Sequence, residues 1–371
     1  MFDRLKKQSA SDLSKQELKH RIQELKAEAS RLSNESDPNQ EMLAKCFKEL
    51  ERCFRALADK ESFPPLEEKH RSKAANWRKA ADQKRVVDSS SITPEVEHER
   101  EGQEGGQEDE TEEFDWRDPE IDFSDVGGRD ELKSRLWELA IGPVESKEQH
   151  RKYGVPVPNG VLFAGPPGTG KSHMAKALAG ELDRKYLDIS LAEIRDSLAG
   201  ESEKNVKRLF EQAKEHQPCL IIIDEVDALI QQRGSNDLSA GMRQLVSQFL
   251  RDMPSLKEED VLIVGTTNFQ GDMDDAVDRP GRFGQDFTIG LPGKACRQEV
   301  LQIHLEDRPV ASSSVDLREI ARLTQDYSCA DLEEVTVEAA RKALKEDAYI
   351  TQKHLECGVQ QVDPSVNPSK W

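Results

Sequence analysis

The chain of 371 residues is long enough for two or three domains. Its net charge of −19 disfavours nucleic acid and anionic membrane surfaces as main partners. No apolar run approaches the roughly 18–20 residues of a transmembrane helix, and the first residues lack the apolar stretch of a signal peptide. We therefore expect a cytoplasmic protein that binds no nucleic acid and has no integral membrane segment.

Three helices are predicted in the first 90 residues. The capping box Ser14–Glu17 precedes the first, and Asp37-Pro38 gives the second a cap and a first-turn proline. Apolar residues then recur three or four positions apart, as on one face of a helix: Leu18, Ile22, Leu25, Ala29 and Leu32, then Leu43, Phe47, Leu50, Phe54 and Leu57, then Leu66, His70, Trp77 and Ala81. Residues 1–90 are therefore predicted to form an all-α N-terminal module, either a three-helix unit or a coiled coil.

An acidic linker is predicted at residues 91–122. This stretch holds 14 acidic and 2 basic side chains and few apolar ones, so burial would not offset its ordering entropy. Phe114 and Trp116 near its end are candidates for docking, but we favour a solvated linker throughout. The six cysteines form no CxxC pair, and the seven-residue spacing of Cys46 and Cys53 indicates buried thiols on one helical face.

From Phe123 onward, apolar runs alternate with amphipathic helical segments, which is typical of a parallel sheet covered on both faces. The expected strands are 160–164, 186–189, 219–223, 261–264 and 287–289. After Pro292 the pattern becomes helical only. The fold class is therefore α/β, with a parallel sheet over residues 123–292 and a small C-terminal helical subdomain over 293–371.

A phosphate-binding loop, G-x-x-x-x-G-K-S, occupies Gly165–Ser172 between a predicted strand and a predicted helix. Its glycines let backbone N–H groups surround phosphate oxygens, and the helix N-terminus favours an anion. Lys171 is placed to reach the β- and γ-phosphates of ATP, and the Ser172 hydroxyl to hold Mg²⁺. The remaining loop residues expected to touch the nucleotide are Pro167, Gly168, Thr169 and Gly170.

Two acidic residues end the apolar strand at 219–223. Because neighbouring strand residues point to opposite sides, Asp224 is predicted to hold the metal and Glu225 to activate the attacking water. Asn268 ends another apolar strand, where an amide suits the positioning of that water. Arg279 and Arg282 flank a rigid Pro-Gly pair, and their planar guanidinium groups suit phosphate recognition.

Taken in order, these motifs resemble the AAA ATPase family from about Phe123 to the C-terminus. The resemblance implies that Asp125 and Gly127, within Phe123–Gly128, lie against adenine, that Asn268 is the sensor-1 residue, and that Arg279 and Arg282 are arginine fingers reaching a neighbouring subunit's nucleotide. It also places His304 near adenine and Ala330, within Ser328–Leu332, in the nucleotide site.

Gly200–Glu203 and the C-terminal Val362–Val366 are similar to the katanin, spastin and ESCRT-disassembly branch and to archaeal Cdc48-like enzymes. The N-terminal helices on a linker resemble that branch's MIT-domain arrangement. Three positions depart from the family pattern: Leu198 replaces a pore-loop aromatic residue, Pro254 follows Met253 where Met-Asp-Gly is usual, and Cys329 replaces a glycine.

The resemblance implies a ring, expected to be a homo-hexamer, that hydrolyses ATP with Mg²⁺ and remodels, unfolds or disassembles protein substrates recruited by the N-terminal helices. The alternative is a nucleotide-dependent assembly switch or scaffold that forms rings without threading substrate, which Leu198 and Pro254 favour. Intact Lys171, Asp224 and Glu225 argue against an inactive ATPase.

Overall fold

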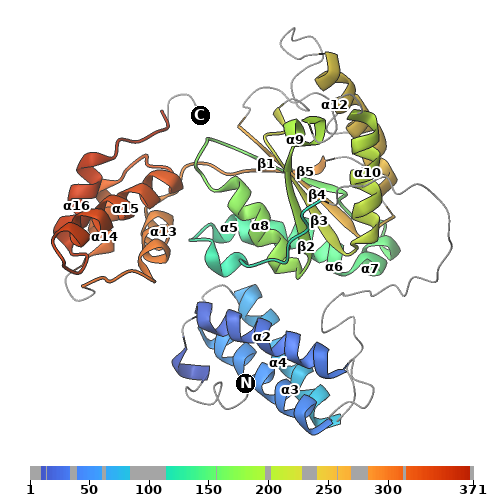
Figure 1. The fold of residues 1–371 in the computed structure, drawn as a ribbon, viewed down its shortest axis with the longest axis horizontal. Coiled ribbons are helices and arrows are strands. Elements are labelled where there is room, and N and C mark those ends of the chain that lie inside the picture. Colours follow the sequence, from blue (N-terminus) through green and yellow to red (C-terminus); the bar gives the residue numbers. More distant parts are fainter. Residues whose placement is uncertain are drawn as a thin grey trace. The chain divides into compact units, whose positions relative to one another are not determined.

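The computed structural model describes residues 10–13, 15–33, 40–60, 64–83, 114–155, 157–196, 202–227, 240–256, 258–268, 283–311 and 315–367. The chain divides into two compact units, Met1–Thr111 and Glu112–Trp371 (Figure 1). Among the helices within these ranges, none is long and apolar enough to cross a bilayer.

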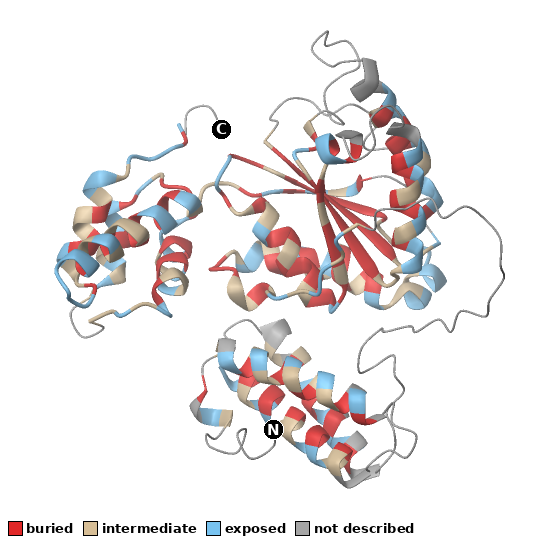
Figure 2. Cartoon of the chain, in the orientation of Figure 1, coloured by how far each residue is buried: buried red, intermediate tan, exposed pale blue. Residues whose placement is uncertain are grey.

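The N-terminal unit contains the predicted three helices: α2 (Lys15–Ser33), α3 (Gln40–Asp59) and α4 (Pro64–Gln83), with a short 3-10 turn at Ala10–Asp12. The apolar stripes predicted from the sequence meet in its core, with Leu18, Phe47 and Trp77 all buried (Figure 2). The ring centroids of Phe47 and Trp77 lie 5.3 Å apart, so the two rings pack α3 against α4. Ser14 and Asp37-Pro38, the predicted caps, lie outside the described residues.

The cysteines of α3 are buried as predicted. Cys46 and Cys53 are both fully buried within the helical core. Burial disfavours the charged thiolate, and it raises the pKa of each thiol to about 11. Both therefore act as small apolar side chains that pack between the helices.

A five-stranded parallel sheet forms the centre of the second unit, in the order β2-β3-β4-β1-β5. Its strands are β1 (Gly160–Ala164), β2 (Lys185–Ser190), β3 (Cys219–Asp224), β4 (Val261–Thr267) and β5 (Phe283–Thr288). The central strand β4 is buried at every position, whereas β5 at the sheet edge alternates buried and exposed residues. The neighbouring carboxyl ends of β1, β3 and β4 meet at one edge of the sheet.

Helices cover both faces of this sheet. Helix α8 (Lys171–Leu182) lies on one face, and α10 (Ser202–Glu215) and α12 (Ala240–Asp252) lie on the other (Figure 1). The shorter elements of this unit are the 3-10 turn Phe123–Asp125, α5 (Asp130–Leu136), the π-helical turn Trp137–Ile141, α6 (Gly142–Glu145), α7 (Lys147–Lys152), α9 (Leu191–Asp196) and the 3-10 turn Met253–Leu256. Pro254 thus lies in the 3-10 turn that follows α12. A proline at this position favours the end of the helix.

The chain after β5 is helical, as predicted. Its helices are α13 (Lys294–Leu305), α14 (Leu317–Leu323), α15 (Cys329–Lys345) and α16 (Gln352–Gln361). They share a core of their own, in which Leu301, Leu332 and Leu355 are fully buried. We call these four helices the lid. The parallel sheet, the lid and the helical N-terminal unit confirm the predicted fold class.

The segment Phe114–Arg117 corrects the expectation of a linker solvated to residue 122. Its backbone pairs with edge strand β2, since Arg117 and Tyr186 exchange two N–H···O bonds of 2.8 Å. Phe114 and Trp116 pack against the core between the sheet and α10, where Trp116 stacks on His216 with ring centroids 4.9 Å apart. The sequence prediction missed this docking because two aromatic residues in an acidic run carry no periodic signal.

Replacing Trp116 with alanine should lower the free energy of unfolding of residues 112–371 by about 2 kcal/mol, because a large, mostly covered aromatic side chain at the edge of the core loses its packing. Urea denaturation followed by circular dichroism measures the difference. Tyr153→Ala is the matched control, since Tyr153 is 81% exposed. Equal stability losses in the two variants would show that Trp116 does not hold this segment on the sheet.

Candidate nucleotide-binding site

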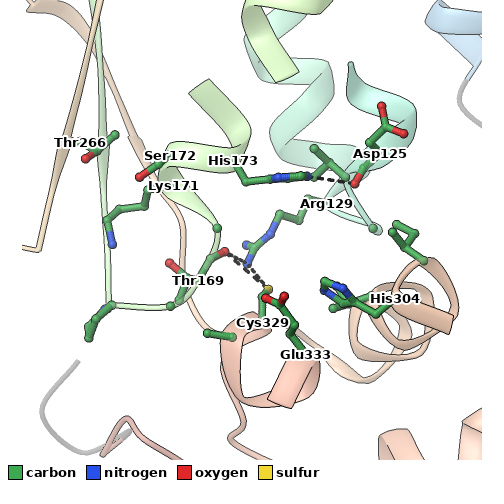
Figure 3. Close-up of a pocket in the computed structure, with 18 of the residues that line it drawn as sticks. Asp125, Arg129, Thr169, Lys171, Ser172, His173, Thr266, His304, Cys329 and Glu333 are labelled. Carbon is green, nitrogen blue, oxygen red and sulfur yellow. Dashed lines mark hydrogen bonds between the residues drawn. The ribbon is translucent and has the colours of Figure 1, made fainter. Parts of the chain in front are cut away.

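A cavity of about 470 Å³ opens at the carboxyl ends of β1, β3 and β4, bounded by the start of α8, the segment before α5 and the lid (Figure 3). It brings together thirteen of the residues predicted from the sequence: Asp125, Gly127, Pro167, Gly168, Thr169, Gly170, Lys171, Ser172, Asp224, Glu225, Asn268, His304 and Ala330. Arg279, Arg282 and Leu198 lie outside the described residues.

The phosphate loop runs from β1 into α8, as its motif requires. Gly168 and Gly170 have φ values of 72° and 91°, a left-handed conformation that favours glycine. A side chain at Gly168 would also lie 2.8 Å from the Ser328 hydroxyl, and the Gly168 carbonyl accepts a 3.0 Å bond from the Ala330 N–H. The loop is therefore in direct contact with the first turn of lid helix α15.

Lys171 is a buried cation at one end of the cavity. Its ammonium group donates to the carbonyls of Gly165 (3.0 Å) and Pro166 (2.8 Å) and to the Asn268 side-chain oxygen (2.7 Å). Burial lowers its pKa, while the carboxylates of Asp224, Asp227 and Glu225 oppose that shift. A desolvated ammonium group whose acceptors among the described residues are all neutral is well suited to an anionic ligand such as a phosphate.

Ser172 and Asp224 form a cluster of hard oxygen donors beside Lys171. The Ser172 hydroxyl donates to both carboxylate oxygens of Asp224, at 2.9 and 3.0 Å. Thr266 from β4 also donates to Asp224 and fixes its orientation. One carboxylate and one hydroxyl, completed by phosphate oxygens and water, match the ligands that Mg²⁺ prefers. The residues present therefore fit the predicted metal.

The direction of the Glu225 side chain is not set by strand alternation, contrary to the prediction from the sequence. Strand β3 ends at Asp224, and Glu225 has a left-handed φ of 55°, so strand alternation does not set its direction. The Glu225 N–H donates to the Thr266 hydroxyl at 3.4 Å. The left-handed turn brings both acidic residues to the same cavity, with Glu225 exposed to it.

Asn268 is held between two groups of opposite charge. Its side-chain oxygen accepts from Lys171, and its backbone N–H donates to Asp227 at 3.2 Å. Asp227 also accepts from the Thr267 hydroxyl. With its oxygen bonded to Lys171, Asn268 retains its NH₂ group as a donor for a ligand in the cavity. The sequence prediction did not include Asp227, although it follows the two acidic residues closely.

The opposite end of the cavity is largely apolar. Gly127 packs so closely on α13 that a side chain there would lie 2.8 Å from the Val300 backbone nitrogen. Val300, Ile303 and His304 of α13 line this end together with Asp125. Burial lowers the pKa of His304, so its ring is neutral at pH 7. A neutral ring beside apolar side chains and backbone groups suits a nucleobase.

Residues that the sequence did not single out also line the cavity: Val126, Arg129, His173, Thr266, Val300, Ile303 and Glu333. The Arg129 guanidinium donates to the Thr169 carbonyl at 2.9 Å and lies 3.9 Å from the Cys329 sulfur (Figure 3). Thr266 belongs to the strand that ends at Asn268, a position that offered some signal. Arg129 offered none, because a single arginine at a helix start is common on protein surfaces.

Cys329 should react with iodoacetamide slowly at pH 7 and faster above pH 9. Burial raises the pKa of its thiol, although Arg129 opposes the shift, and the thiolate is the reactive form. Bound ADP should protect Cys329, which lines the cavity, and should leave the labelling of Cys357 unchanged. Mass spectrometry of tryptic peptides measures both sites. Equal labelling of Cys329 with and without ADP would contradict its placement beside the nucleotide.

Two family models match this unit. Residues 161–291 match the ATPase family associated with various cellular activities (AAA), and residues 314–357 match the AAA+ lid domain. The chain is 38% identical to the cell division cycle protein 48 homolog of Archaeoglobus fulgidus over 265 residues, which are 67% of this chain and 36% of that protein. It is 34% identical to protein CdcH of Halobacterium salinarum over 252 residues, 67% of this chain and 34% of that protein.

The parallel sheet, the phosphate loop and the Ser172–Asp224 cluster define a P-loop nucleoside triphosphatase domain. With the lid matched as well, the chain belongs to the AAA ATPase family, as its motifs predicted. It spans about a third of the length of the curated relatives that it matches.

Proposed function

We propose that this chain is an ATP-hydrolysing motor subunit that works in an oligomeric ring to remodel, unfold or disassemble proteins. One observation carries the proposal: a single cavity gathers a buried lysine, a serine–aspartate pair and an exposed glutamate around a phosphate loop. Membership of the AAA family supports the same activity.

In this proposal the phosphate end of the cavity binds the triphosphate. Gly168, Thr169 and Gly170 offer backbone N–H groups, and Lys171 exchanges its carbonyl partners for β- and γ-phosphate oxygens. Ser172 and Asp224 would hold Mg²⁺, which neutralises charge on the phosphates when bound. Asp125, Gly127, His304 and Ala330 hold the adenosine part, and Pro167 lines the cavity from the phosphate loop.

Hydrolysis is an attack of water on the γ-phosphorus with loss of ADP. Glu225 accepts the proton of that water, and the Asn268 amide holds the water in line with the bond that breaks. Thr266 supports this arrangement because it contacts the backbone of Glu225 and the carboxylate of Asp224. The bond between the γ-phosphorus and the bridging oxygen breaks, and ADP leaves with that oxygen.

Arg279 and Arg282 are proposed to complete the site of a neighbouring subunit. A contact between the nucleotide cavity of one copy and the arginine segment of the next is head-to-tail, and such contacts close into rings. We propose a homo-hexamer in the cytoplasm. The N-terminal helices α2 to α4 are proposed to select the protein substrate, as an MIT-like module does.

The rival function is a nucleotide-dependent assembly switch that forms rings but threads nothing. Leu198 favours it, because leucine at the pore-loop position offers less contact area than an aromatic side chain. Under the motor proposal, Leu198→Tyr speeds the unfolding of a reporter protein and leaves the basal ATPase rate unchanged. Under the switch proposal, neither Leu198→Tyr nor Leu198→Ala has an effect on unfolding.

The test of the proposed function measures phosphate release and the unfolding of a fluorescent reporter protein fused to a captured target. The full chain should release phosphate and unfold the reporter. A chain that begins at residue 112, where the second unit begins, should keep its basal ATPase rate and lose stimulation by the target. Phosphate release without unfolding would favour the assembly switch, and no phosphate release would overturn the proposal.

A further inference from the structure

Arg129 places a second cation inside the cavity, between its two ends (Figure 3). Its Nη2 atom donates to the carbonyl oxygens of Thr169 (2.9 Å) and Gly290 (3.1 Å) and lies 3.9 Å from the Cys329 sulfur. Among the described residues, its hydrogen-bond partners are thus neutral, and none is a carboxylate. A half-buried guanidinium group with only neutral partners is well placed to bind an anion.

The backbone of Arg129 is unusual for an arginine. Its φ and ψ of 61° and 33° are left-handed, a region where asparagine, aspartate and glycine are favoured over other residues. Gly128 before it is also left-handed, and a side chain there would lie 3.0 Å from Cys296. The two residues form the turn that begins α5 and carry the Arg129 side chain into the cavity. A residue held in a disfavoured conformation at a cavity indicates that its side chain has a role there.

The position of the guanidinium group selects one part of the ligand. Lys171 and Ser172 lie at the phosphate end, whereas Asp125 and His304 lie at the base end (Figure 3). Arg129 lies between them and is bonded to the loop at Thr169. Within the part of the chain that the structure describes, its bonds come from Nη2 alone, so the Nε and Nη1 donors remain for a ligand. The group between a nucleobase and the β-phosphate is the ribose with its α-phosphate.

We propose that Arg129 is a nucleotide-binding residue that recognises the α-phosphate, with its fork of N–H donors directed at the phosphate oxygens. This inference rests on the proposed nucleotide function and adds a residue to it. Because ATP and ADP share the α-phosphate, Arg129 binds substrate and product alike. It thereby contributes to nucleotide affinity in both states, whereas Glu225 acts on turnover.

The test compares Arg129→Asn and Arg129→Lys in the full chain with Arg151→Asn. Asparagine tolerates the left-handed backbone, so the first variant removes the charge without adding strain. Arg151 is exposed and pairs with Glu258 outside the cavity, which makes it the matched control for charge loss. Dissociation constants for ADP, AMP and adenosine are measured by competition with a fluorescent nucleotide.

Arg129→Asn should weaken ADP and AMP binding by the same factor, about tenfold or more, because each loses one charge-assisted hydrogen-bonding group. Adenosine binding should not change, Arg129→Lys should lie between the wild type and Arg129→Asn, and the Arg151 variant should match the wild type. Adenosine binding that weakens as much as ADP binding, or ADP binding that does not weaken, overturns the inference alone. A wild-type chain that binds no phosphate-bearing nucleotide overturns the proposed function as well.

Discussion

Replacing Glu225 with glutamine should leave ATP bound and slow its hydrolysis by about 10²–10⁴-fold, the range of a general base. The change keeps the shape of the side chain and removes its ability to accept a proton. Binding survives because the residues that hold the phosphates and the metal in our proposal are positioned without Glu225: Lys171 bonds to the loop carbonyl of Gly165, and Ser172 bonds to Asp224.

Phosphate release and nucleotide binding are measured on the same preparation. Glu333→Gln is the matched control, because Glu333 lines the same cavity on the lid, away from Lys171 (Figure 3). It should leave turnover within a few-fold of the wild type. The assignment of Glu225 would be wrong if its glutamine variant hydrolysed ATP at the normal rate, or if it lost ATP affinity as completely as Lys171→Ala.

Subunits that lack both Arg279 and Arg282 should hydrolyse ATP about 10³–10⁵-fold more slowly, as expected for the loss of an arginine finger. Mixing them with Lys171→Ala subunits should restore part of the rate. In a mixed ring, an arginine-deficient subunit binds ATP, and its Lys171→Ala neighbour supplies the arginines. Neither variant hydrolyses ATP efficiently alone.

The mixing experiment titrates one variant against the other at constant total concentration. Co-assembly is checked by pulling down one tagged variant and detecting the other. Recovery should be greatest near equal amounts, where mixed neighbours are most frequent. Co-assembled rings that show no recovery at any ratio would place the arginines in the site of their own subunit.

Much of the fold could be predicted because its signals are local. The buried strands β1, β3 and β4 are nearly continuous apolar runs, and their helices have clear apolar faces. Strand β5 was predicted too short, as only 287–289. It begins at Phe283, and its exposed positions at the sheet edge carry polar residues that hide the strand pattern.

The phosphate end of the site was predictable because its residues follow one another in a fixed spacing along the chain. The role of Arg129 and the contact of Gly168 with Ser328 were not predictable, because each joins segments that lie at least 40 residues apart in the sequence. The left-handed conformation of Glu225 was missed for a related reason. Non-glycine residues carry little sequence signal for a positive φ, which the surrounding structure imposes.

The docking of Phe114–Arg117 on β2 shortens the tether between the two units. The chain from Gln83 to Phe114 can span at most about 110 Å, against about 140 Å if it were first held at Phe123. The end of α4 is therefore confined to a sphere of that radius around Phe114, so if α2 to α4 carry a target as we propose, its effective concentration at the ATPase is about 0.3 mM. Release of Trp116 from its site would let that sphere roughly double in volume, and the local concentration of a captured target would halve.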